Sequence, residues 1–197
     1  MTLGSTPLTA GCLLVAAPTL MDPHFMHSVI LVCAADAEEG VMGLILNDDS
    51  GFTSGDLLGG HPAFEESDYL VGQGGPVGRD QVHFLHNIPE QIQGGREVPE
   101  GLFLGGEIEM LGDWMAKNQG LEGHSSSVTL YVGYAGWGAG QLDQELAEGS
   151  WLILPGQKSL PFECQGRSRE EVWRRVLGAQ GDQGRYLSYA PPDPNWN

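Results

Sequence analysis

Three side chains that could make a nucleophilic site lie in the first half of the chain. Ser28 supplies a hydroxyl, His86 could take its proton, and Asp22 could orient the imidazole. The sequence around the serine gives this arrangement no support, because no G-x-S-x-G elbow is present and Ser28 is equally typical of a polar residue that starts a strand. A small hydrolase-like enzyme using Ser28 or His86 is therefore kept as the alternative function.

A glycine-rich segment offers a second kind of chemistry. Residues Gly133–Gly140 (GYAGWGAG) follow an apolar run and precede a helical pattern, which is where a phosphate-binding loop would stand. The spacing fails the dinucleotide fingerprint, since the third glycine counted from Gly136 falls on Gln141, and no G-K-[ST] follows. We therefore expect a four-glycine structural turn that packs a partly buried Trp137, with positive φ at Gly136 or Gly138.

Histidines, carboxylates and cysteines do not form the pattern of a metal site. The pairs His24/His27 and His83/His86 are three residues apart, and on a strand such residues point to opposite faces. The acidic stretches lack the D-x-D-x-D-G series of a calcium loop, and the chain has no C-x-x-C pair. No metal and no cofactor is predicted, and the three cysteines are expected to be buried thiols.

The charge balance argues against several classes of partner. The chain of 197 residues carries 26 acidic and 9 basic residues, a formal net charge of −17. Four arginines gather between Arg167 and Arg175, beside Glu170 and Glu171, and no helix-turn-helix is recognisable. Because such a chain repels polyanions, we expect no direct binding to nucleic acid or to anionic membranes. No apolar stretch approaches the roughly 20 residues of a membrane span, so a cytoplasmic protein is expected.

Short apolar runs bounded by Gly, Pro or Asn predict more strands than helices. The strands are expected at residues 12–17, 28–33, 41–46, 69–71, 82–86, 127–133 and 151–154. Helices are expected at residues 107–118 and 141–148. A third helix is expected after Ser168, which forms an S-x-x-E capping box with Glu171. The arginines of this third helix should face solvent. Because helices do not alternate with strands, an α+β fold with a mixed sheet is predicted, as one domain over residues 1–197.

Three motif segments together resemble the AlgH/YqgE family. They are residues 17–29 (APTLMDPHFMHSV), residues 40–47 (GVMGLILN) with the later GGPV at 74–77, and residues 133–145 (GYAGWGAGQLDQE). The resemblance covers Leu13 to about Gly178. It implies an α+β domain whose bifurcated sheet forms a pseudo-barrel with helices packed outside, and a bacterial protein labelled a transcriptional regulator without an established activity. The chain departs from the pattern at His27, where the family usually carries a basic residue, and at Asp48 and Asp49, where a basic residue and proline are common.

These segments also give the candidate site. Gln141 and Glu145 share one helix face and could hydrogen-bond a ligand or cap the neighbouring loop. Trp, Tyr, His, Asn and Gln among glycines suit contact more than core filling, so we expect a non-catalytic regulatory or binding module that acts indirectly, through an unidentified small molecule or protein partner. The predicted site residues are Asn47, Gly74, Gly75, Pro76, Val77, His86, Tyr134, Gly136, Trp137, Gly138, Gln141 and Glu145.

Overall fold

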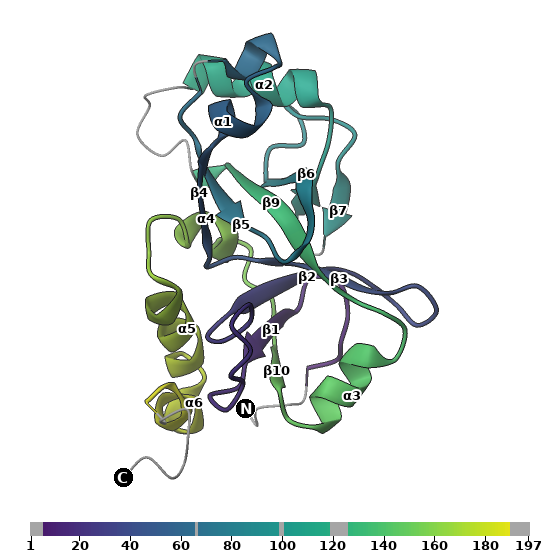
Figure 1. Cartoon of the computed structure of the whole chain (residues 1–197), viewed down its shortest axis with the longest axis vertical. Coiled ribbons are helices and arrows are strands. Elements are labelled where there is room, and N and C mark those ends of the chain that lie inside the picture. The colour runs from purple at the N-terminus through teal and green to yellow at the C-terminus, as the bar shows by residue number, and fades with distance from the viewer. Residues whose placement is uncertain (1–5, 66, 99–100, 119–125, 190–197) are drawn as a thin grey trace.

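The computed structural model describes residues 6–65, 67–98, 101–118 and 126–189. Figure 1 shows the arrangement of its elements. The strands are β1 (Leu13–Ala16), β2 (Val29–Asp36), β3 (Gly40–Ile45), β4 (Asp49–Thr53), β5 (Leu70–Gln73), β6 (Val77–His86), β7 (Arg96–Val98), β8 (Leu102–Leu104), β9 (Val128–Trp137) and β10 (Trp151–Leu154). The helices are α1 (Ser54–Leu58), α2 (Ile108–Asn118), α3 (Gln141–Ala147), α4 (Leu160–Glu163), α5 (Arg169–Gly178) and α6 (Gly181–Ser188), with a 3₁₀ turn at Pro62–Phe64.

One long strand, β9, joins the two halves of the sheet. The strand order is β10-β1-β2-β3-β9-β6-β8-β7, and β5 pairs with β9 as a branch. The first part of β9 pairs in parallel with β5 and antiparallel with β6, whereas its last residues, 135–137, pair with β3. The predicted α+β fold with a mixed, bifurcated sheet is confirmed. The path runs from β10 to β7 and does not close into a barrel within the described part of the chain.

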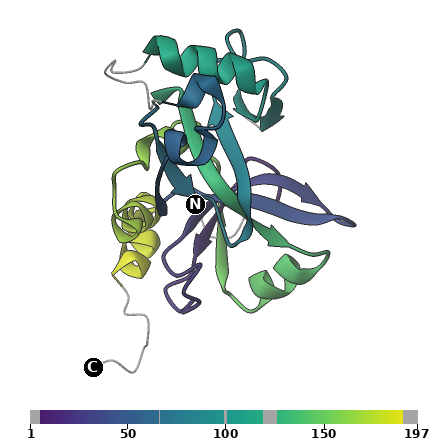
Figure 2. The same cartoon turned by 45° about the horizontal axis from the view of Figure 1, so that its top comes forward.

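The helices cover two separate apolar cores. One core lies around β1, β2 and β10, where Trp173 of α5 is buried and its Nε1 donates to the carbonyl oxygen of Ala16 at 2.7 Å. The other lies between β5, β6 and β9 and the helix α2, which contributes Leu111, Trp114 and Met115. Both views place α1 and α2 at one end of the molecule and α3 at the opposite end (Figures 1 and 2). No helix in the described segments is long and apolar enough to cross a membrane.

Local sequence explains where the helices begin. Ser168 caps α5 as predicted, since its hydroxyl accepts from the backbone N–H of Glu171 at 3.2 Å. The Glu171 carboxylate pairs with Arg167 at 2.7 Å, so the reciprocal half of the capping box is not seen. A complete capping box is found instead at α1, where Thr53 and Asp56 bond each other's backbone N–H groups.

The glycine-rich segment differs from its prediction. We expected a turn over Gly133–Gly140, but β9 continues through Trp137 because Val41, Met42 and Gly43 pair with Trp137, Gly136 and Ala135. Only residues 138–140 form the turn to α3. The glycines with positive φ are Gly133 (φ 70°) and Gly140 (φ 74°), and the expectation for Gly136 or Gly138 was wrong.

The position of Gly133 tolerates no side chain. A Cβ atom there would lie 2.5 Å from the carbonyl oxygen of Gly75 and 2.9 Å from that of Val77, whereas a Cβ at Gly138 would meet no atom within 4 Å. Gly133 thus allows the Gly74–Val77 segment to approach β9 closely.

We predict that Gly133→Ala lowers the free energy of unfolding by at least about 2 kcal/mol, because a left-handed backbone conformation and a backbone clash add together. The matched variant Gly138→Ala should leave stability unchanged within about 0.5 kcal/mol. Urea unfolding followed by tryptophan fluorescence measures both. Equal stabilities of the two variants would contradict the close approach assigned to Gly133.

Candidate functional site

Asn47 is a buried structural amide and does not face solvent. Its side chain is 3% exposed, and its Oδ1 accepts from the N–H of Val29 at 2.8 Å. Its Nδ2 donates to the carbonyl oxygens of His27 at 2.9 Å and Arg169 at 2.8 Å. One amide therefore ties the end of β3 to the loop before β2 and to the first residue of α5.

Arg169 is held against the same loop instead of pointing to solvent. It forms an ion pair with Asp48, and its Nη1 donates to the carbonyl oxygens of His24 at 3.1 Å and Met26 at 3.3 Å. The expectation that the arginines of this helix form a solvated outer face is therefore wrong for Arg169. Asp48, which removes positive charge from a motif segment, serves as its partner.

His86 is fully buried in the sheet. Its Nε2 lies 3.1 Å from the carbonyl oxygen of Gly105, and its ring stacks on Phe103 with centroids 5.4 Å apart. Burial lowers the pKa of His86, and the bond to Gly105 opposes this shift only in part. Ser28 is also fully buried, and no hydrogen bond within the described residues joins Ser28, His86 and Asp22. The structure thus does not assemble the nucleophilic arrangement that the sequence left open.

Glu145 holds two tryptophans together. Its Oε2 accepts from Nε1 of Trp137 at 3.0 Å and from Nε1 of Trp151 at 2.8 Å. Its Oε1 accepts from Nε2 of Gln141 at 2.9 Å, and the Gln141 Oε1 accepts from the N–H of Gly138 at 3.2 Å. Trp137 is 4% exposed, more deeply buried than expected, and Phe25 packs on it at 6.0 Å between centroids. Gln141 and Glu145 therefore cap the neighbouring loop, one of the two alternatives that the sequence left open.

A cavity of about 590 Å³ lies on the sheet where β9 changes partners, and we call it the sheet-face hollow. Strands β2, β3, β6 and β9 surround it. β6 pairs with β9 only as far as Tyr134, and beyond that point Gly136 has no side chain to fill the space. Gly136 on β9 pairs with Met42 on β3, and Met42 pairs with Ala34 on β2. Because Gly136 has no side chain and that of Ala34 is small, the surface of the sheet is recessed here. The hollow is thus the space left by an unpaired strand edge and two small residues.

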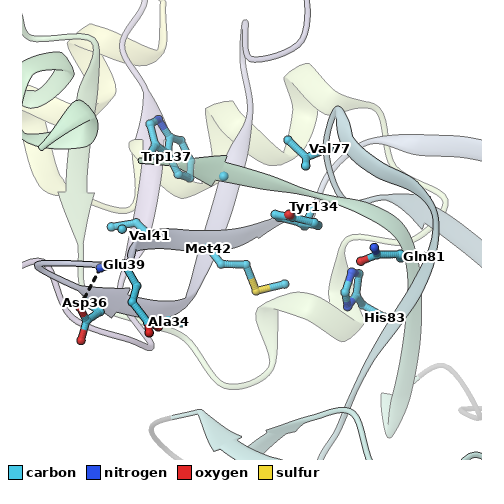
Figure 3. Close-up of a pocket in the computed structure, with 12 residues that line it drawn as sticks. Ala34, Asp36, Glu39, Val41, Met42, Val77, Gln81, His83, Tyr134 and Trp137 are labelled. Atoms are coloured by element: carbon cyan, nitrogen blue, oxygen red, sulfur yellow. Dashed lines mark hydrogen bonds between the residues drawn. The ribbon is translucent and has the colours of Figure 1, made fainter. Parts of the chain in front are cut away.

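The hollow has two chemically different ends. Figure 3 shows Met42 and Tyr134 in the middle, Asp36 and Glu39 toward one end, and Gln81 with His83 toward the other. No Lys or Arg lines it. The Asp36 carboxylate accepts from the backbone N–H groups of Glu38 and Glu39, which lowers its pKa below the ordinary value. The hollow therefore joins an apolar middle to a negatively charged end.

His83 lies at the other end of the hollow. Burial lowers the pKa of His83, and its ring lies edge-on to Tyr134 with centroids 5.8 Å apart. Its Nε2 is buried and has no hydrogen-bond partner among the described residues.

The predicted site residues are distributed over several places. Val77, Tyr134, Gly136 and Trp137 line the sheet-face hollow. Gly75 and Pro76 line a smaller pocket, Gly138 lines a third near α3, and Gly74 packs against the backbone of Gly133. Sequence reasoning missed the hollow's other walls, because Gly136 was taken as part of a turn and not as a strand residue without a side chain. In the described segments no three His, Cys, Asp or Glu side chains group as metal ligands do.

We predict that Glu145→Ala lowers the free energy of unfolding by about 2–4 kcal/mol, because two indole N–H groups lose their acceptor. The control is Glu148→Ala on the same helix, whose exposed carboxylate only accepts from Gln144 and which should cost less than about 0.5 kcal/mol. Thermal unfolding measures stability, and the tryptophan emission maximum reports the change at the indoles. A Glu145→Ala variant as stable as the control would contradict the role given to Glu145.

Comparison with known proteins gives a consistent relationship over nearly the whole chain. The AlgH-like family model matches residues 13–185. A UPF0301 protein of Chlorobaculum tepidum is 37% identical over 190 residues, covering 96% of each chain, and one of Streptomyces avermitilis is 36% identical over 192 residues, covering 95% of this chain and 94% of the relative.

Two solved structures share the fold. The solution structure of AlgH from Pseudomonas aeruginosa has a TM-score of 0.67 at 29% identity and covers 90% of this chain and 93% of its own. The crystal structure of a Corynebacterium diphtheriae protein has a TM-score of 0.73 at 22% identity and covers 96% of this chain and 95% of its own. Together with the family match and the relatives above 30% identity, these findings show that the chain belongs to the AlgH-like family.

Proposed function

We propose that this protein is a non-catalytic regulatory or binding module whose site is the sheet-face hollow. The observation that carries the proposal is the hollow itself, at about 590 Å³ with an apolar middle and polar ends. Small-molecule sites typically measure about 300–1,000 Å³ and combine mostly apolar walls with a few polar groups. The hollow has this size and this composition.

The charges around the hollow select the ligand. Asp36 and Glu39 lie at one end, and no basic side chain among its lining residues balances them. The aromatic ring of Tyr134 and the thioether of Met42 offer contact to an apolar group. A ligand with an apolar body and one amine or guanidine group fits this lining, whether it is a small molecule or a side chain of a protein partner.

The side chains that line the hollow lack the nucleophiles that hydrolases most often use. The residues around the hollow include no Ser, Thr, Cys or Lys, and the Asp36 carboxylate is bonded to the backbone of its own turn. His83 has no serine, threonine, cysteine or lysine beside it to activate, which favours recognition over covalent catalysis. These features support a binding role over the hydrolase alternative.

Any regulatory effect on transcription would be indirect. The only basic cluster is neutralised, because Arg167, Arg174 and Arg175 pair with Glu171, Glu170 and Glu163. Arg169 pairs with Asp48. A net charge of −17 opposes approach to a phosphate backbone, so the route to regulation runs through a ligand or another protein.

The binding proposal is tested with aromatic and branched amines and guanidines, each compared with a neutral isostere of the same shape. We expect the charged probes to raise the melting temperature and to shift the amide resonances of residues 34–42 and 134–137, with weaker or no effect from the isosteres. Glu39→Gln should weaken binding by about 2- to 5-fold, because one charge at the rim is lost. The exposed Glu97 lies on β7, outside the hollow, and Glu97→Gln should leave binding unchanged.

Filling the hollow provides a second test. Ala34→Phe adds a ring to the floor and should abolish probe binding while the protein stays folded by circular dichroism. Retained binding in this variant, or equal binding of charged probes and neutral isosteres, would place the ligand elsewhere. If the purified protein still hydrolyses generic esterase or phosphatase substrates, the hydrolase alternative is favoured instead.

Direct binding to nucleic acid is tested separately. We expect the protein to show no salt-sensitive, sequence-selective affinity for duplex DNA in fluorescence anisotropy titrations at low ionic strength, where electrostatic attraction would be strongest. Submicromolar affinity that falls with added salt would overturn the indirect route.

A further inference from the structure

A second pocket brings two arginines together. It measures about 180 Å³ and lies where the Gly75–Pro76 segment meets the loop before β2 and the start of α5. Arg79 and Arg169 both line it, although they come from distant parts of the sequence. We call this space the arginine pocket. It shares no lining residue with the sheet-face hollow.

More than half of the basic side chains in this chain are paired with carboxylates. Of the nine basic residues, five form ion pairs, which are Arg167, Arg169, Arg174, Arg175 and Arg185. Arg79 is exposed and forms no ion pair with any described residue. Within the pocket, Asp48 balances Arg169, so Arg79 leaves an excess of positive charge in a protein that is otherwise strongly acidic.

Arg169 is already fixed in position. Its ion pair with Asp48 and its bonds to the carbonyl oxygens of His24 and Met26 use Nη1 and Nη2. Its Nε makes no hydrogen bond to the described residues and remains a donor. A guanidinium held by other contacts loses little conformational freedom on binding a ligand.

The opposite wall is rigid backbone. Gly75 has φ 153°, and a Cβ there would lie 2.2 Å from the carbonyl carbon of Tyr134, so the chain passes too close for any side chain. Its carbonyl oxygen accepts from Nε2 of Gln73 at 2.6 Å, and Pro76 follows with its fixed φ. The pocket is therefore bounded by segments that cannot easily rearrange.

We propose that the arginine pocket binds a small oxyanion, namely a phosphate group, free or carried by a small molecule. Its volume lies below the roughly 300 Å³ at which sites for whole drug-sized ligands begin, so it suits a charged group more than a complete molecule. Guanidinium groups match phosphate oxygens in geometry and charge. Arg79 supplies the uncompensated charge, and Arg169 supplies a positioned donor.

The test uses inorganic phosphate and methyl phosphate, titrated into the full chain at constant ionic strength against sodium chloride. We expect saturable shifts of the amide resonances of Gln73, Gly75 and His24 with either phosphate and none with chloride. Binding of both compounds would show that the pocket recognises the phosphate group itself. Identical responses to phosphate and chloride would reveal charge screening alone and would overturn the proposal.

Arg79→Gln tests the residue directly, and because Arg79 is exposed the variant should fold as the unmodified chain does. This variant should bind phosphate at least about tenfold more weakly, because a charge-assisted contact is lost. Arg185→Gln removes an exposed arginine on α6 that pairs with Asp182, and it should bind phosphate as the unmodified chain does. Unchanged affinity in Arg79→Gln, or no saturable binding in the unmodified chain, contradicts the assignment.

Discussion

The buried amide of Asn47 is the interaction on which the rest of this structure depends. It accepts one backbone hydrogen bond and donates two, and its partners belong to the start of β2, the loop before it and the first residue of α5. An aspartate could not donate these bonds, and a leucine of similar size could neither accept nor donate. Three backbone groups would then be left unpaired in a site with little access to water, which is costly. Together with the buried Trp173, this side chain fixes the start of α5 and with it the place of Arg169 on the pocket wall.

The sequence predicted the elements whose signals are local. Apolar runs located β1, β2, β3 and β10, and the hydroxyl of Ser168 correctly marked the start of α5. β4 was missed because its sequence, DSGFT, has neither alternation nor an apolar run, and it forms only because β5 offers an edge. β9 was cut short because glycines were taken as a turn, whereas pairing with β3 keeps the strand extended through Trp137. Pairing between strands that are far apart in the sequence cannot be recognised from the residues of one short segment.

The candidate site was harder to predict for a related reason. Asn, His, Gln and Glu were expected to contact a ligand, but Asn47, His86 and Glu145 turn inward and satisfy backbone or indole groups. The partner of the Asn47 amide at Arg169 lies 122 residues away, so sequence alone could not separate a buried polar network from an exposed site. The sheet-face hollow forms because Gly136 and Ala34 have little or no side chain to fill the space. No sequence motif marks such an unfilled volume. Of the predicted site residues, Val77 and Tyr134 line the hollow because they flank that gap.

The position of β9 also has a consequence for how the chain can be divided. This strand carries Leu130 and Val132 into one core and Ala135 and Trp137 into the other, while it pairs with β3, β5 and β6. Removing β9 would take core side chains from both halves and break the pairing of β3 with the rest of the sheet, so a cut between the two cores would expose apolar surface on both sides. Insertions or gene fusions would be tolerated at surface loops but not between the cores. A boundary drawn between the two cores would pass through a strand that contributes side chains to both.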